Sequence, residues 1–215
     1  MLCILVFVGM SEVFVGCAPN LTLSDSISYA DAASEDLKGL HIIEGGTLSA
    51  NVVPQATSYG ATVHAADSIS GLTYPNFNPC IGYSYGIASR SFAAALSVQM
   101  FMLGADLTIR PGNNLFVTGN ITTNSSFGLA CTSRLNRSIT LGPFYRRDRF
   151  EGFILGDGAK WLRDSRYFAD TYGLKGSFMY SAGSGYARII FLAAGYNPEV
   201  ESIFISVGMN GFKIH

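Results

Sequence analysis

The strongest regularity in the sequence is an alternation of apolar and polar residues with a period of two. It is clearest in residues 172–180. Leu174 and Phe178 share one face of that segment, and Lys175 lies on the other. The same alternation recurs in three further segments, 115–122, 138–146 and 202–210. Successive side chains of a β-strand point to opposite sides, so each segment is predicted to be a strand with one apolar face.

Turn residues separate these segments. Clusters of Gly, Asn and Pro stand at 110–114, 182–185 and 196–199, where Gly and Asn tolerate positive φ and Pro fixes its own φ. Counting segments between turns predicts about ten strands of roughly 8–12 residues. Their approximate bounds are 58–66, 79–88, 94–109, 115–123, 126–135, 138–146, 150–156, 171–181, 186–196 and 202–212. Residues 39–53 are a further strand candidate whose place is open.

The composition of the polar face separates a membrane barrel from a soluble sandwich, because the strands of both alternate. Asp, Glu, Lys and Arg together make up 13% of the residues, about half the usual share for a soluble protein. Gly, Ser, Thr and Asn fill the polar face, which suits the inner wall of a barrel. The predicted fold is therefore all-β, an antiparallel up-and-down transmembrane barrel of about ten strands (range about 8–12).

Aromatic residues gather near the predicted strand ends, as in the interfacial girdles of membrane barrels. They are Tyr83, Tyr85, Phe144, Tyr145, Tyr172, Tyr180, Tyr186 and Tyr196. From about residue 79 onward the sequence resembles the bacterial outer-membrane β-barrel superfamily, which includes the small outer-membrane-protein-A-like barrels. Residues 105–119 and 203–212 carry the resemblance. It implies a barrel in the bacterial outer membrane and no particular activity.

The N-terminus contains a second resemblance. An apolar stretch, Leu2–Val8, precedes Phe14-Val15-Gly16-Cys17, which resembles the lipobox of bacterial lipoprotein signal peptides. The resemblance implies that residues 1–16 are a signal peptide and that Cys17 is lipidated. Residues 17–38 would then be a tether and residues 39–215 the barrel domain. The alternative is an ordinary secretory signal in which Cys17 has no role.

Two groups of charged residues are candidate sites. Polar residues expected to face the lumen are Arg134, Lys175, Arg188 and Asp106. The three cations could select anions or pair with an acidic neighbour such as Asp106. Arg146, Arg147 and Arg149 form the densest charge cluster, and guanidinium groups suit the phosphates of outer-membrane lipid or of lipopolysaccharide. The alternative for this cluster is a solvated turn at the membrane surface.

No motif marks a reaction. His64, Asp67 and Ser68 stand close together, but a strand would turn Asp67 away from the other two. No metal-ligand spacing or phosphate-binding loop is present, and no cofactor is indicated. A net charge of −1 gives no footprint for nucleic acid. Whether Cys80 and Cys131 pair is open, as is the oligomeric state.

Three functions follow from these patterns. The first is an outer-membrane barrel with a structural or small-pore role, lipid-anchored at its N-terminus. The second is a soluble lipoprotein of lipocalin or sandwich type that binds an apolar ligand. The third is a lipid-modifying enzyme that uses His64 and Ser68. The leading expectation is the first, without enzymatic activity.

Overall fold

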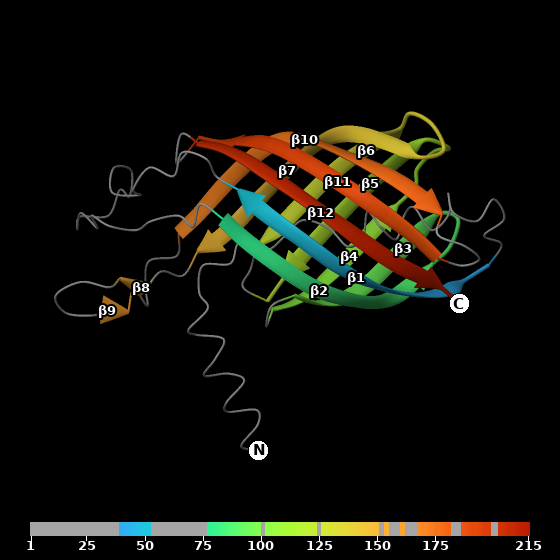
Figure 1. Cartoon of the computed structure of the whole chain (residues 1–215), viewed down its shortest axis with the longest axis horizontal. Helices are drawn as coiled ribbons and strands as arrows, with labels where there is room; N and C mark the ends of the chain where they lie inside the picture. Colours follow the sequence, from blue (N-terminus) through green and yellow to red (C-terminus); the bar gives the residue numbers. More distant parts are fainter. Residues whose placement is uncertain are drawn as a thin grey trace, which may run out of the picture.

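The chain forms a closed antiparallel β-barrel of ten strands (Figure 1). The computed structural model describes residues 39–52, 77–99, 102–123, 126–150, 153–154, 160–161, 167–181, 186–198 and 202–215. The barrel strands are β1 (His41–Val52), β2 (Phe77–Ala88), β3 (Phe92–Gln99), β4 (Met102–Ile109), β5 (Leu115–Thr122), β6 (Phe127–Arg134), β7 (Ile139–Phe150), β10 (Tyr167–Ser181), β11 (Tyr186–Asn197) and β12 (Ser202–Ile214). The predicted up-and-down barrel is confirmed.

Pairing between the first and last strands closes the sheet. β1 pairs with β2 on one side and with β12 on the other, with Leu48 opposite Met209 in the second pair. The amide of His215 donates to the carbonyl oxygen of Ile42 at 2.8 Å and continues the ladder beyond β12. An open antiparallel sheet would leave unpaired backbone groups along its two edge strands, and closure into a barrel removes these edges.

The predicted number of strands is correct, but the ten are not the same. Residues 94–109 contain two strands, β3 and β4, rather than one. The candidate segment 39–53 contains β1, which is a strand of the barrel wall. The predicted strand 150–156 is wrong, because Phe153–Ile154 (β8) pairs with Lys160–Trp161 (β9) in a separate two-stranded sheet. The predicted strand 58–66 lies outside the described residues, as do residues 1–38.

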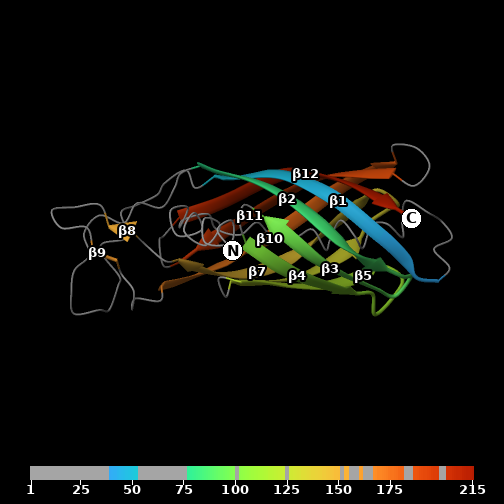
Figure 2. The same ribbon diagram turned by 90° about the horizontal axis from the view of Figure 1, so that it is seen from below.

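The barrel has two unlike ends (Figures 1 and 2). At the C-terminal end, where β12 terminates and β1 begins, short connections join the strands, namely 89–91, 110–114, 135–138 and 182–185. At the opposite end, here called the far end, lie the two longest connections, 53–76 and 151–166, the second of which contains β8 and β9. Long connections therefore share one end.

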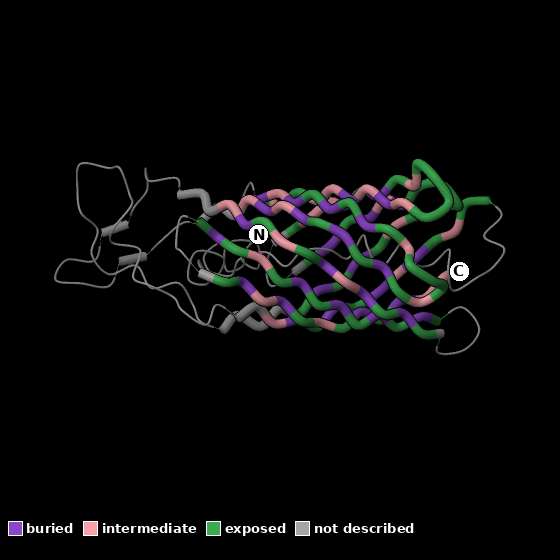
Figure 3. The backbone as a smooth tube through the Cα atoms, turned by 90° about the horizontal axis from the view of Figure 1, so that it is seen from above, coloured by how far each residue is buried: buried purple, intermediate pink, exposed green. Residues whose placement is uncertain are grey.

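Buried residues alternate with more exposed ones along most of the barrel strands (Figure 3). β11 is the plainest case, with a nearly unbroken alternation of exposed and buried positions. The predicted facing is confirmed at Leu174 and Phe178, which are exposed, and at Lys175 and Thr140, which are buried. The inner wall differs from the prediction in its aromatic content, because Phe144 and other phenylalanines also point inward.

Inward glycines make room for these rings. The ring of Phe144 lies over Gly173, where an added Cβ would stand 2.7 Å from its Cε1 atom. The ring of Phe191 likewise occupies the space above Gly208 on the neighbouring strand. Laying an aromatic ring over a neighbouring glycine fills the wall without crowding the backbone. The glycines of the inward face therefore leave the space that the inward phenylalanine rings fill.

Candidate functional site

The outer surface of the barrel is apolar around its whole circumference. Each of the ten strands exposes large apolar side chains, among them Leu48, Ile81, Leu96, Leu107, Ile121, Leu129, Leu141, Leu174, Leu192 and Val207. Among strand residues with described side chains, the outward charges lie toward the two ends: Glu44, Arg147, Asp170, Arg188 and Lys213. Exposed apolar surface on this scale requires an apolar solvent, so the middle of the barrel is suited to hydrocarbon.

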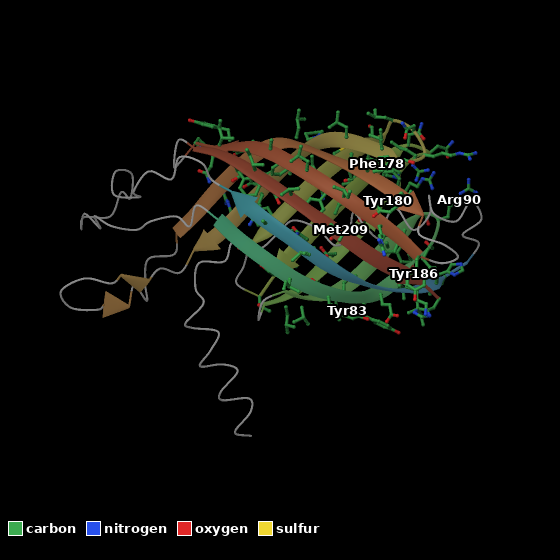
Figure 4. All side chains as sticks on the ribbon, viewed as in Figure 1. Tyr83, Arg90, Phe178, Tyr180, Tyr186 and Met209 are labelled. Carbon is green, nitrogen blue, oxygen red and sulfur yellow. The ribbon has the colours of Figure 1, made fainter. Side chains whose placement is uncertain are left out.

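Tyrosines bound the apolar surface at both ends. Tyr145, Tyr172 and Tyr196 form one cross-strand row on β7, β10 and β11, and the rings of Tyr145 and Tyr172 lie 5.1 Å apart. Toward the C-terminal end the outward aromatics include Tyr83, Tyr180 and Tyr186, which Figure 4 labels, and also Tyr85. Of the predicted girdle residues, Phe144 alone is buried inside.

The distance between the girdles fits a bilayer. Tyr186 and Tyr196 stand at opposite ends of the outer face of β11, about 34 Å apart at roughly 3.4 Å per residue. A strand tilt near 40° reduces this to a height of about 26 Å, which matches the apolar band of about 25 Å in outer-membrane barrels. The barrel therefore has the dimensions of a membrane-spanning one.

The interior is packed. Its fully buried side chains include Phe116, Lys175, Ile189, Asn210, Thr108, Thr118 and Thr140. An apolar cluster fills the lumen toward the C-terminal end, built from Ile43, Ala88, Ala93, Ala95, Met179, Ala187, Ile189 and Phe212. Elsewhere the interior contains polar contacts, as where the hydroxyls of Thr108 and Thr118 lie 3.0 Å apart. Side chains thus fill much of the space within the sheet.

Two cationic side chains in this interior lie close to aromatic rings. Arg146 lies 5.3 Å from the ring centre of Phe204, and the ammonium of Lys175 lies 5.5 Å from that of Phe191. Cation–π contacts of this kind are favourable and gain strength where water is excluded. They give the buried cations partial compensation for their lost hydration.

A third aromatic ring carries two cations. The guanidinium groups of Arg110 and Arg134 lie 5.7 and 5.1 Å from the ring centre of Phe116. Burial, and then the like charge of Arg134, lower the pKa of Arg110, which stands in the turn after β4. Several cations therefore point into the barrel, and Asp106 is the one acidic residue among the described inward side chains.

The predicted lumen residues divide into two groups. Asp106, Arg134 and Lys175 point inward. Arg188 does not: it is exposed on the outer face of β11, because Ala187 and Ile189 on either side take the inward positions. Its assignment to the lumen is wrong. β11 is apolar on both faces near this point, so the sequence alone did not indicate which face Arg188 occupies.

The three arginines proposed for headgroups are also separated. Arg146 is 2% exposed inside the barrel, so its assignment to the surface is corrected, because alternation along β7 turns it away from Arg147. Arg147 is outward, and its Nε and a terminal nitrogen donate to the two carboxylate oxygens of Asp170, each at 2.7 Å. Tyr145 donates its hydroxyl to the same carboxylate at 2.9 Å. The Arg149 side chain and Cys17 lie outside the described residues.

Sequence reasoning missed the interior residue Phe116 and missed Arg110, whose guanidinium lies over the Phe116 ring from the turn after β4. Phe116 shares its strand face with Thr118 and Asn120, and this apolar residue on a polar face was the available signal. Cys131 is exposed on the outer face of β6 and forms no disulfide. Within the described ranges no group of His, Cys, Asp and Glu could hold a metal ion, and no helix is long and apolar enough to cross a membrane.

Known proteins offer distant structural similarity. No family model and no curated protein matches the sequence. Ail, the attachment invasion locus protein of Yersinia pestis, solved in complex with the heparin analogue sucrose octasulfate, is 9% identical at a TM-score of 0.33, covering 81% of this chain and 96% of that chain. The toluene transporter TbuX of Ralstonia pickettii is 8% identical at 0.36, covering 82% and 89%. Outer membrane protein Omp33 of Acinetobacter baumannii is 9% identical at 0.27, covering 83% and 100%.

At such identities and TM-scores the three structures carry no argument about this chain. Its placement rests on its own surface. An antiparallel barrel closed by an even number of strands, with an apolar band between two tyrosine girdles, is the architecture of bacterial outer-membrane proteins. By that criterion the chain has the architecture of a membrane-spanning β-barrel.

Proposed function

We propose that this protein is an outer-membrane barrel with a structural role, whose packed interior does not conduct and whose N-terminus is lipid-anchored at Cys17. The observation that supports a structural role is the burial of the inward side chains. Lys175 is 1% exposed and Ile189 equally buried, whereas a water-filled channel would leave its wall residues hydrated. A packed barrel presents its far-end connections at the cell surface on a rigid support.

Conductance measured in planar bilayers tests this role. The purified barrel is expected to insert without steady current. A Phe191→Ala/Phe212→Ala variant removes two rings from the interior and is expected to give openings that the parent lacks. A uniform, reproducible conductance from the unmodified protein would refute the structural role.

That outcome would favour a second candidate, a small anion-selective pore. The observation that supports it is the excess of cations, since Arg134, Arg146 and Lys175 face inward and Asp106 is the one inward acidic residue whose side chain is described. Under a salt gradient the sign of the reversal potential of such a pore would show that anions permeate more readily than cations. Lys175→Gln should move that potential toward zero, while Lys213→Gln on the outer face should leave it unchanged.

The proposed orientation places the C-terminal end in the periplasm and the far end outside the cell. It is supported by connection lengths, because periplasmic turns of such barrels are short and extracellular loops long. β1 begins at the C-terminal end, so a tether preceding it would start on the periplasmic side. A lipid on Cys17 would there reach the inner leaflet of the outer membrane.

Mass spectrometry of the N-terminal peptide tests the anchor. A lipoprotein is expected to yield a peptide that begins at Cys17 and carries diacylglycerol. Cys17→Ala should lose the lipid and keep the folded barrel. A mature peptide that begins elsewhere, without lipid, would refute the anchor and leave the barrel unaffected.

A further inference from the structure

The outer surface of the barrel contains a hollow lined by residues of β1, β2, β11 and β12. It lies at the C-terminal end, where the register aligns one outward row across β11, β12, β1 and β2, consisting of Arg188, Gly211, Gly46 and Tyr83. A Cβ at Gly211 would meet nothing within 4 Å, and one at Gly46 would meet the Gly82 carbonyl oxygen at 3.9 Å. The two glycines therefore leave a notch of ≈ 400 Å³ between the arginine and the tyrosine.

The next row toward the barrel end is polar. It contains Glu44 and Lys213 side by side on β1 and β12. Glu44 is held from two sides: Tyr83 donates its hydroxyl to Oε2 at 2.8 Å, and the His215 ring lies 2.9 Å from Oε1. The Lys213 ammonium stands 5.8 Å from the centre of the Tyr186 ring. Glu44 is the only carboxylate among the described residues that line the notch, and both of its oxygens are already engaged.

Arg188 supplies the other cation of the notch. It is exposed, and the described part of the chain gives its guanidinium no hydrogen-bond or ion-pair partner. Arg188 and Lys213 together outweigh Glu44 by one positive charge. A cation that faces outward at the edge of an apolar surface calls for an anion at that level.

Toward the middle of the barrel the notch opens onto an apolar row. The register aligns Ile190, Met209, Leu48 and Ile81 there, and all four are about half exposed or more. In Figure 4, Tyr186 lies close to the C-terminal end, and Met209 lies back along β12 toward the middle of the barrel. An occupant of the notch would thus have an anionic head beside a hydrocarbon body.

We propose that the notch binds the phosphate of a glycerophospholipid of the periplasmic leaflet, with an acyl chain along the Met209 row. A guanidinium pairs bidentately with phosphate, and the tyrosines stand at the height of the headgroups. The orientation proposed above selects a glycerophospholipid over lipopolysaccharide. The inference rests on the membrane-spanning barrel and is independent of whether the lumen conducts.

Native mass spectrometry of the detergent-purified protein tests the site, with phosphatidylglycerol as the probe and diacylglycerol of the same acyl chains as the phosphate-free comparison. Phosphatidylglycerol is expected to saturate one site, and Arg188→Gln to weaken it about tenfold, from the loss of a charged hydrogen-bond partner. Gly211→Leu keeps both cations and fills the notch, so it should weaken binding too. Arg90→Gln, an exposed arginine in a turn at the same end, is the matched control and should bind as the parent does.

Equal binding of phosphatidylglycerol by the parent and Arg188→Gln would overturn the site, as would equal binding of diacylglycerol. Tighter binding of lipopolysaccharide at Arg188 would overturn the choice of leaflet. Gel mobility with and without boiling is recorded for every variant. A protein that shifts on boiling yet lacks selective binding refutes the notch alone, whereas a parent protein that never shifts refutes the barrel.

Discussion

Placing an arginine at Leu192 tests how deep the outer face of β11 lies in the membrane. Leu192 is 56% exposed and stands between Tyr186 and Tyr196. At roughly 3.4 Å per residue it lies about 20 Å along the strand from the first tyrosine and about 14 Å from the second. With a tilt near 40°, these distances become depths of about 15 and 10 Å, near the middle of the apolar band.

The expected cost follows from that depth. Leu192→Arg should lower the free energy of unfolding by about 2–4 kcal/mol, the range for a basic residue at the bilayer midplane. Tyr186→Arg places the same side chain at the girdle, where the cost is about 0–1 kcal/mol. Leu192→Ala measures the loss of the leucine itself, so the difference between the two Leu192 variants isolates the charge.

Equilibrium urea titration in lipid vesicles, followed by the mobility shift of the folded barrel on unheated gels, measures these values. A membrane-embedded outer face predicts a clearly larger loss of unfolding free energy for Leu192→Arg than for Tyr186→Arg. Equal costs at the two positions would refute the depth assignment. A small cost at both would place the outer face of β11 in water.

Three further predictions concern other parts of the barrel. Gly208→Ala pushes a methyl group into the ring of Phe191 and should lower the free energy of unfolding by about 1–3 kcal/mol. Gly46→Ala adds its methyl group in open space and should change that free energy by no more than about 0.5 kcal/mol. The same urea titration compares the two variants, and equal costs would contradict the packing of Phe191 over Gly208. A double-mutant cycle of Arg147→Gln and Asp170→Asn should give a coupling energy of about 1 kcal/mol or less for unfolding, because the Arg147 side chain is 41% exposed. A coupling energy of several kcal/mol would contradict the exposure of this ion pair to water. Single cysteines replacing Trp161 and Ser184, without Cys80 and Cys131, test orientation: an impermeant maleimide on whole cells should label the first and not the second, and the reverse would invert the barrel.

The sequence predicted the barrel because its strongest signal is periodic. Alternation at 115–122, 138–146 and 202–210 coincides with β5, β7 and β12. Boundaries were harder to predict where the turn chemistry is unremarkable. The connection between β3 and β4 lies at residues 100–101, Met and Phe, so apolar residues continue through the reversal and hide it. β1 was left open for a different reason: its pairing with β12 joins residues far apart in the chain.

The candidate site was harder to predict than the fold, because a facing error reverses a residue's role. Arg188 stands on a strand that is apolar on both faces, so no alternation assigned it a side. Arg146 was grouped with Arg147 as neighbours in sequence, although neighbours on a strand face opposite ways. The notch depends on Gly211 and Gly46 being neighbours across two strands, and that register is absent from any local pattern.

The membrane-embedded barrel is the central claim, and alkaline carbonate extraction of membranes containing Cys17→Ala tests it most directly. Without a lipid anchor, the barrel alone must hold the protein in the bilayer. The apolar outer belt predicts that the variant stays in the membrane pellet and still migrates faster unboiled than boiled. Release of the variant into the supernatant would contradict the embedded barrel and favour a soluble protein that touches the membrane by its lipid alone.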